Sequence, residues 1–230
     1  MNIDLTYPTS WEEVTSKQLM IIAEQMLKGR TREELLFEVF RRITGIRVVV
    51  NREENITEYL FAKGRKRFKV PVQTIMQGCE DMSFIIEKTG LPESPILSVG
   101  TKLHGKSFRQ YYFANAYFNR YLQTKEICMI DNMYKALIDR KPSEITPKEI
   151  MAITIWWSGL QAHLKEKFPK VFSEEQGEQS KSTPADILQE ILSVLNNNKP
   201  QENESILNSD MYAVFHSLQY IYSNPRNDNN

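Results

Sequence analysis

Apolar residues recur every three or four positions over two stretches near the start of the chain, 15–29 and 31–44. Ser10, Thr15 and Thr31 each stand three residues before a Glu or Gln, which is the spacing of a capping box at a helix start. Gly29 follows the first apolar stripe in the position of a helix C-cap. The pattern predicts one helix ending near Gly29 and a second over 31–44.

After Gly45 the helical spacing gives way to short runs of β-branched and aromatic residues, at 46–50, 56–61 and 68–72. The last two runs are separated by a turn that contains a glycine, which is typical of a β-hairpin. We expect these runs to form a hairpin or a three-stranded antiparallel sheet near residues 46–72.

Helical spacing then returns and recurs as far as about residue 221, interrupted by a Pro- and Gly-containing connection at 90–105 and by polar stretches further on. The predicted fold class is therefore mainly α, a multi-helix domain with a small β element. The remaining predicted helices cover 72–88, 107–123, 125–139, 146–164, 183–195 and 204–221.

Two polar stretches, 173–182 and 196–203, are expected to be linkers and suggest how the chain is divided. Residues 173–182 are sparse in apolar side chains and are interpreted as a linker. We expect a main helical domain over 1–172 with the small sheet inserted in it. A C-terminal helical pair over 183–222 is expected to dock on that domain, and residues 223–230 are expected to form a disordered tail.

The stretch 107–123 is the most aromatic in the sequence, and its apolar residues fall into two stripes. One stripe consists of Phe108, Tyr111, Tyr112, Phe118 and Leu122. The opposite stripe consists of Phe113, Tyr117 and Tyr121. Two stripes indicate a helix buried on two sides, although partner-binding surfaces also concentrate Tyr and Phe. Phe113, Tyr117 and Tyr121 are therefore candidate partner contacts, together with Trp156 at the margin of the 146–164 stripe, whereas Trp157 is expected in the core.

Composition changes this picture little. The 230 residues are 41% hydrophobic and 25% charged, as in ordinary globular proteins, and 29 Lys and Arg balance 29 Asp and Glu. No overall positive field would attract nucleic acid or an anionic membrane. The densest local charge is a group of five cations about the predicted hairpin turn: Lys63, Arg65, Lys66, Arg67 and Lys69.

Such a basic hairpin has two interpretations. It can straddle a phosphate backbone while an aromatic residue between the cations stacks on a base. A solvated turn that protects a sheet edge from aggregation gives the same sequence. Nucleic-acid contact by these five residues is kept as the alternative function.

Candidate chemistry is sparse. The three histidines, His104, His163 and His216, are far apart and have no metal-ligand spacing, and no glycine-rich phosphate loop occurs. Cys79 and Cys128 lie in apolar stretches and are expected to be buried thiols. We therefore expect no catalytic site, no metal and no cofactor. No stretch of about 20 apolar residues predicts a membrane segment, so a cytoplasmic location is expected.

Several phrases of the sequence resemble uncharacterised proteins of bacterial prophages and mobile elements. The phrases are those at 7–19, at 67–70, in the aromatic stretch 108–121, and at 157–159 leading to 168–172. Genes of such proteins often lie among virion-assembly genes, near tail components. The resemblance implies a non-enzymatic role in protein–protein interaction, in virion (tail) assembly or chaperone-like, with phage or mobile-element structural proteins as partners. It also implies a location in a bacterial host or with the virion.

Overall fold

The chain is described from a computed structural model, in which it divides into two compact units. The first unit comprises 1–96 with 146–159, and the second comprises 97–145 with 160–230. The structure describes residues 5–49, 58–63, 66–87, 90–96, 98–139, 144–172, 183–197 and 199–224.

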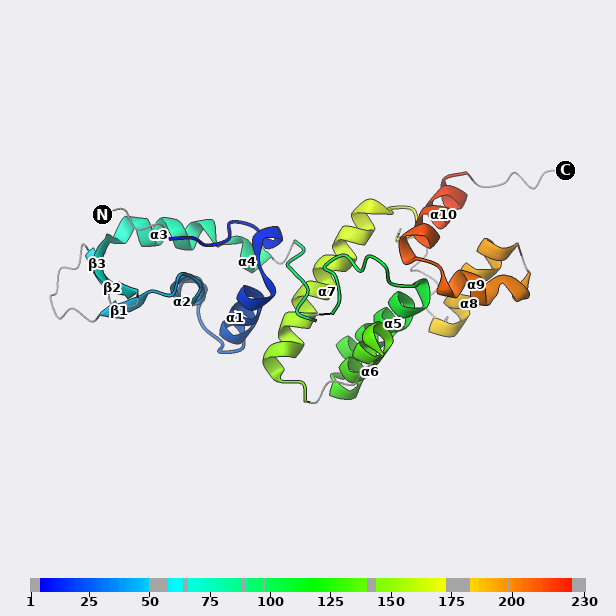
Figure 1. Ribbon diagram of the computed structural model, residues 1–230, viewed down its shortest axis with the longest axis horizontal. Coiled ribbons are helices and arrows are strands. Elements are labelled where there is room, and N and C mark those ends of the chain that lie inside the picture. Colours follow the sequence, from blue (N-terminus) through cyan, green and yellow to red (C-terminus); the bar gives the residue numbers. More distant parts are fainter. Residues whose placement is uncertain are drawn as a thin grey trace. The chain divides into compact units, whose positions relative to one another are not determined.

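The chain is mainly helical, as its apolar spacing predicts (Figure 1). The first unit contains η1 (Trp11–Glu13), α1 (Ser16–Met26), α2 (Arg32–Thr44), β1 (Arg47–Val49), β2 (Glu58–Lys63), β3 (Lys66–Pro71), α3 (Val72–Asp81), α4 (Phe84–Glu87) and the first part of α7 (Pro147–Lys167). The second contains the last turns of α7 with α5 (Phe108–Thr124), α6 (Ile127–Ile138), α8 (Pro184–Asn196), η3 (Pro200–Glu202), α9 (Asn203–Asn208) and α10 (Met211–Ser223).

Two of the three predicted capping boxes form. At the start of α1, Thr15 accepts a hydrogen bond from the Gln18 amide while the Gln18 side chain accepts one from the Thr15 amide, at 3.3 and 2.9 Å. Thr31 does the same at the start of α2. The box predicted at Ser10 is wrong, because its side chain makes no cap bond and the short segment after it is a 3₁₀ turn.

The predicted three-stranded sheet is confirmed, with the order β1-β2-β3 and antiparallel pairing throughout. Lys63 is paired with Lys66 at the hairpin end, and Phe61 with Phe68 further along. Val70 of β3 is buried. Because α3 follows β3 without a loop, the sheet fixes where α3 begins.

Helices α2 and α3 lie side by side in the first unit (Figure 1). Gly78 of α3 faces the ring of Phe40 of α2 so closely that a Cβ atom at position 78 would overlap the ring. Phe40 itself is completely buried. The absence of a side chain on Gly78 therefore lets the two helices approach at this point.

The second unit is organised around α5, which packs against α6, α9 and α10. The amide of Phe108 donates to the carbonyl of Ser209 at 2.8 Å, and the amide of Met211 donates to that of Lys106 at 3.0 Å. Phe215 of α10 is 3% exposed and packs edge-on against Phe108. Thus α10 is docked through both its backbone and its aromatic side chains.

The two units differ from the expected division of the chain. The segment expected as one main domain over 1–172 contributes to both units, and the C-terminal helices form one unit with α5 and α6. The predicted single helix over 204–221 is two helices, α9 and α10. The second begins anew because the Asp210 side chain caps the amides of Tyr212 and Ala213. The predicted linker 173–182 and the tail from residue 225 lie outside the described residues.

Candidate functional site

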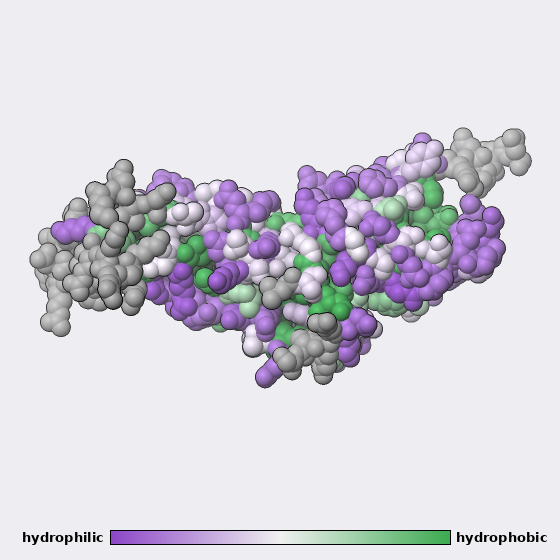
Figure 2. All heavy atoms as spheres, in the orientation of Figure 1, coloured by the Kyte–Doolittle hydropathy of each residue, from purple (hydrophilic) through white to green (hydrophobic). Residues whose placement is uncertain are grey.

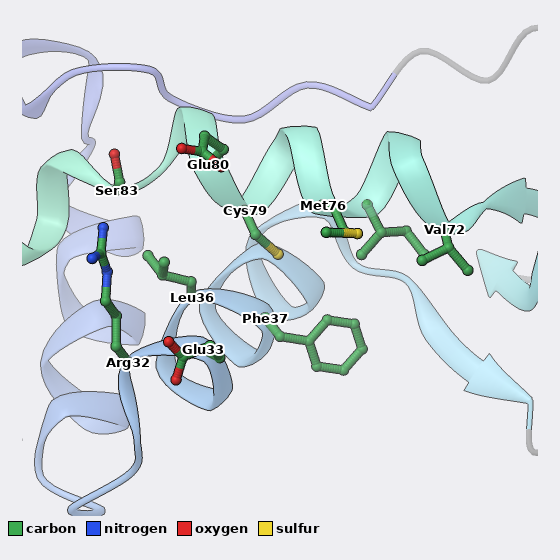
Figure 3. Close-up of a pocket in the computed structure, with 10 residues that line it drawn as sticks. Arg32, Glu33, Leu36, Phe37, Val72, Met76, Cys79, Glu80 and Ser83 are labelled. Atoms are coloured by element: carbon green, nitrogen blue, oxygen red, sulfur yellow. The ribbon is translucent and has the colours of Figure 1, made fainter.

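The strongest candidate site is a groove between α2 and α3 in the first unit (Figure 3). The capping box at Thr31 starts α2, so that Arg32 and Glu33 occupy its first turn. The end of β3 at Pro71 starts α3, so that Val72 lies at the opposite end of the groove. The groove has a volume of about 450 Å³ and is lined by Arg32, Glu33, Leu36, Phe37, Val72, Ile75, Met76, Cys79, Glu80 and Ser83.

One end of this α2–α3 groove is apolar. Met76 is 65% exposed, although it is a large hydrophobic residue, and Phe37 and Val72 beside it are half-buried. Leu36 and Ile75 are buried and form the floor. Methionine adapts its shape to a partner more readily than branched side chains do. This end can therefore receive apolar side chains of a ligand.

The other end of the α2–α3 groove carries the charges of Arg32, Glu33 and Glu80, with Ser83 beside them (Figure 3). Within the described residues none of these three charged side chains forms an ion pair. Two carboxylates against one guanidinium leave this end with a net negative charge. It therefore favours a cationic group on whatever occupies the groove.

Cys79 lies between the two ends, and its sulfur points toward α2 (Figure 3). Burial in apolar surroundings raises the pKa of this thiol to about 11. The thiol is therefore protonated and weakly nucleophilic near neutral pH. Both thiols are expected from the sequence to be buried, but Cys79 is only half-buried. Cys128 is exposed, because α6 directs it away from the buried face formed by Ile130, Met133 and Leu137.

Across the part of the surface in view, hydrophobic side chains appear only in small, separate areas among hydrophilic ones (Figure 2). The large hydrophobic residues that are exposed among those described are Leu27, Met76, Ile86, Phe113, Leu122, Ile127, Ile187 and Tyr220. Scattered apolar residues of this kind are normal on a protein surface. Met76 is one that borders a groove, and the floor of that groove is apolar.

The residues predicted as a partner surface do not lie on one surface. Trp156 is completely buried, so its assignment to a partner surface is wrong; it packs edge-on against Trp157, with ring centres 5.4 Å apart. Phe113 is 40% exposed, whereas Tyr117 and Tyr121 are half-buried. On the opposite stripe of α5, Phe108, Tyr111 and Phe118 are buried. The helix is thus buried mainly on one side.

The basic hairpin is present as predicted, with Lys63 and Lys66 at its end and Lys69 exposed on β3. Arg65 lies outside the described residues. Nucleic-acid contact by the five cations stays a prediction.

In the described part of the chain, no hydrogen bond or ion pair joins one of the three histidines to a carboxylate or to another histidine. His104 is exposed and stacks on the ring of Tyr212, with centroids 5.0 Å apart. His216 packs edge-on against Phe168 at 4.9 Å. Burial lowers the pKa of His163, and Lys102 and Lys167 add to the effect.

Among the described residues, no group of three or more His, Cys, Asp or Glu side chains could hold a metal ion. None of the described helices is long and apolar enough to cross a bilayer.

Comparison of the chain with protein-family models, with curated proteins and with solved structures gives no match. The α2–α3 groove therefore has to be interpreted from its own geometry.

Proposed function

We propose that this chain is a non-enzymatic protein that binds another protein through the α2–α3 groove. The observation that carries the proposal is the exposure of Met76 above an apolar floor of Leu36 and Ile75. Apolar surface bordering a groove loses its contact with water when a partner covers it, which favours binding. The protonated state of Cys79 and the unpaired charges nearby serve binding better than covalent chemistry.

An amphipathic helix is the partner element that fits this geometry. Helices bind in apolar grooves through side chains spaced three or four residues apart. The apolar end, at Phe37, Val72 and Met76, would receive those side chains. The end with Glu33 and Glu80 would attract a Lys or Arg at the end of the partner helix.

The resemblance of the sequence to proteins of prophages and mobile elements supports a partner among phage structural proteins. In that setting the chain would act in virion (tail) assembly or as a chaperone for a structural subunit. A groove that binds one helix suits a chaperone-like role, because it can cover an apolar helix until assembly buries it.

Co-purification with the products of neighbouring genes tests this proposal, with two matched variants. Met76→Glu puts a charge on an exposed groove residue that contributes little to the fold. Tyr220→Glu puts the same charge on α10, where the side chain is 71% exposed and lies outside the groove. We expect the first variant to lose partner recovery by about tenfold or more, because a desolvated carboxylate opposes binding. Equal recovery with both variants, or no partner at any salt concentration, would reject the proposal.

A second candidate function is nucleic-acid binding by the hairpin of β2 and β3. The strand register favours it, because positions 63 and 66 are backbone partners at the hairpin end and the five cations of the sequence therefore fall on this end and on β3.

A further inference from the structure

A second pocket, of about 400 Å³, lies in the second unit between α5 and α8. Its walls are held together by Tyr112 of α5, whose hydroxyl donates a hydrogen bond to the carbonyl of Pro184 at the start of α8. The pocket is of the size that small ligands and short peptide segments occupy.

Hydrogen-bonding side chains from one face of α5 line this pocket. Asn115, Asn119 and Gln123 follow one another at intervals of four residues, with Arg120 beside them. Asn115 is already engaged, because its side-chain oxygen accepts a hydrogen bond from Gln161 at 2.5 Å. In the described part of the chain the side chains of Asn119, Arg120 and Gln123 have no hydrogen bond or ion pair. Three side chains with hydrogen-bonding capacity therefore meet in one pocket without a partner there.

The charge of the pocket restricts its ligand. Among the described residues that line it, Arg120 is the one that carries a charge, and none of them carries a carboxylate. A guanidinium group presents parallel N–H donors that match the two oxygens of a carboxylate. The carboxamides of Asn119 and Gln123 each offer donors and an acceptor, as a peptide group does.

The rest of the wall is apolar. Ile187 of α8 is 44% exposed, and the ring of Tyr112 is half-buried opposite α8. Ala116 lies between Tyr112 and Arg120 on α5 and leaves room there because its side chain is small. These surfaces suit the aliphatic part of a side chain that carries, or lies next to, a carboxylate.

We propose that this α5–α8 pocket binds a carboxylate that adjoins peptide groups. Arg120 pairs with the carboxylate, while Asn119 and Gln123 bond to the neighbouring amides. The carboxylate belongs either to the C-terminus of a polypeptide or to an Asp or Glu side chain within one. This site is independent of the α2–α3 groove.

Calorimetric titration of the full chain with defined peptides tests the site. One tripeptide has a free C-terminus and a blocked N-terminus, and its control is the same peptide with an amidated C-terminus. A third peptide has both ends blocked and a central Glu, and its control has Gln in that place. Inorganic phosphate is the fourth probe.

We expect at least one acid to bind at about tenfold or higher affinity than its amide control, since a charge-assisted hydrogen bond is lost in the amide. Comparison of the first and third peptides then shows whether the pocket prefers a C-terminal carboxylate or that of an acidic side chain. Arg120→Gln should remove this preference. Lys135→Gln, which removes an exposed cation from α6 outside the pocket, should keep it.

A second variant, Asn119→Ala with Gln123→Ala, should weaken both acid and amide peptides, because the carboxamides contact the shared backbone. Equal binding of acids and amides would overturn the proposal. An absence of peptide binding would also overturn it. So would a result in which phosphate binds but the peptides do not, and in which the binding of phosphate depends on Arg120. The four altered residues, Asn119, Arg120, Gln123 and Lys135, are all exposed, so the variants should fold.

Discussion

Gly159 of helix α7 lies against the carbonyl oxygen of Gly90, so closely that a Cβ atom on Gly159 would overlap that oxygen. Gly90 in turn lies against the side chain of Trp11, which is 3% exposed. Three segments that are distant in sequence thus meet in the first unit. At the point of contact two of them contribute a glycine, which has no side chain.

The first prediction follows from this contact. Gly159→Ala should destabilise the protein by about 1–3 kcal/mol, because the added methyl group meets backbone that cannot turn aside. The melting temperature should fall by roughly 2–4 °C per kcal/mol. Gly100→Ala is the matched control, since a Cβ atom there meets nothing within 4 Å. If both variants melt alike, the close approach is not a constraint on the fold.

A second prediction concerns the dependence of stability on pH. Glu38 accepts two hydrogen bonds from the Arg41 guanidinium, at 3.1 and 2.7 Å, and this contact lowers the pKa of Glu38 from its ordinary value of 4.5. A carboxyl group whose pKa is lower in the folded state stabilises the fold fully above pH 4.5. It loses that contribution as the pH falls through the lower, folded value.

Glu38→Gln should therefore cost about 0.5–1 kcal/mol near pH 7, where the pair is formed and partly shielded from solvent. The difference from the unaltered protein should shrink when both are unfolded with urea at about pH 3. Glu190→Gln on the exposed side of α8 serves as control and should change little at either pH. A cost that stays constant across this range would show that the ion pair is not its source.

The third prediction uses the two thiols as probes. Because the pKa of Cys79 is about 11, only about one thiol in a thousand is ionised at pH 8, and its alkylation rate should rise tenfold per pH unit up to that pKa. Exposed Cys128 should react much faster at pH 8. Mass spectrometry of the folded protein after timed iodoacetamide treatment measures both sites. Equal rates at the two cysteines would mean that the groove is more open than described.

Periodicity predicted the mainly helical class and the three-stranded sheet because both depend on local sequence. The capping boxes at Thr15 and Thr31 are satisfied within three residues of the chain, so tertiary contacts do not decide them. Trp156 illustrates the opposite case. Its angle on the helix places it at the margin of the stripe, yet its surroundings bury it completely.

The α2–α3 groove could not be predicted, because it requires two helices to be paired. The sequence held one sign of it: Phe37 does not belong to the stripe of Leu35, Leu36, Val39 and Phe40 that buries α2. An aromatic residue off the buried stripe indicates either a second contact or an exposed site. The position of α3 beside it depends on the close contact between Gly78 and Phe40, which no local pattern reveals.

The fourth prediction tests nucleic-acid binding by the basic hairpin. Replacement of Arg65, Lys66 and Arg67 by alanine should abolish a gel shift of single-stranded nucleic acid if these residues contact phosphates. For the unaltered chain, the logarithm of the affinity should then fall linearly with the logarithm of the salt concentration. The size of the slope should be near the number of phosphate contacts.

The control for this comparison removes three exposed cations elsewhere, Lys17, Lys135 and Lys199, and so has the same net charge. It should bind as the unaltered chain does. Equal and negligible binding by all three proteins would exclude the alternative function.

The last prediction concerns the attachment of α10. Phe215 is 3% exposed and packs edge-on against Tyr111 and Phe172, with ring centres 5.1 and 5.3 Å apart, in addition to its contact with Phe108. Phe215→Ala should cost about 3–5 kcal/mol, because it leaves a cavity among rings that cannot all move together. Tyr220→Ala on the same helix removes a side chain that is 71% exposed and should cost little. Urea unfolding of both variants measures the two costs. Similar values for Phe215→Ala and Tyr220→Ala would mean that α10 contributes little to the stability of the fold, and its apolar stripe would then be a surface for a partner.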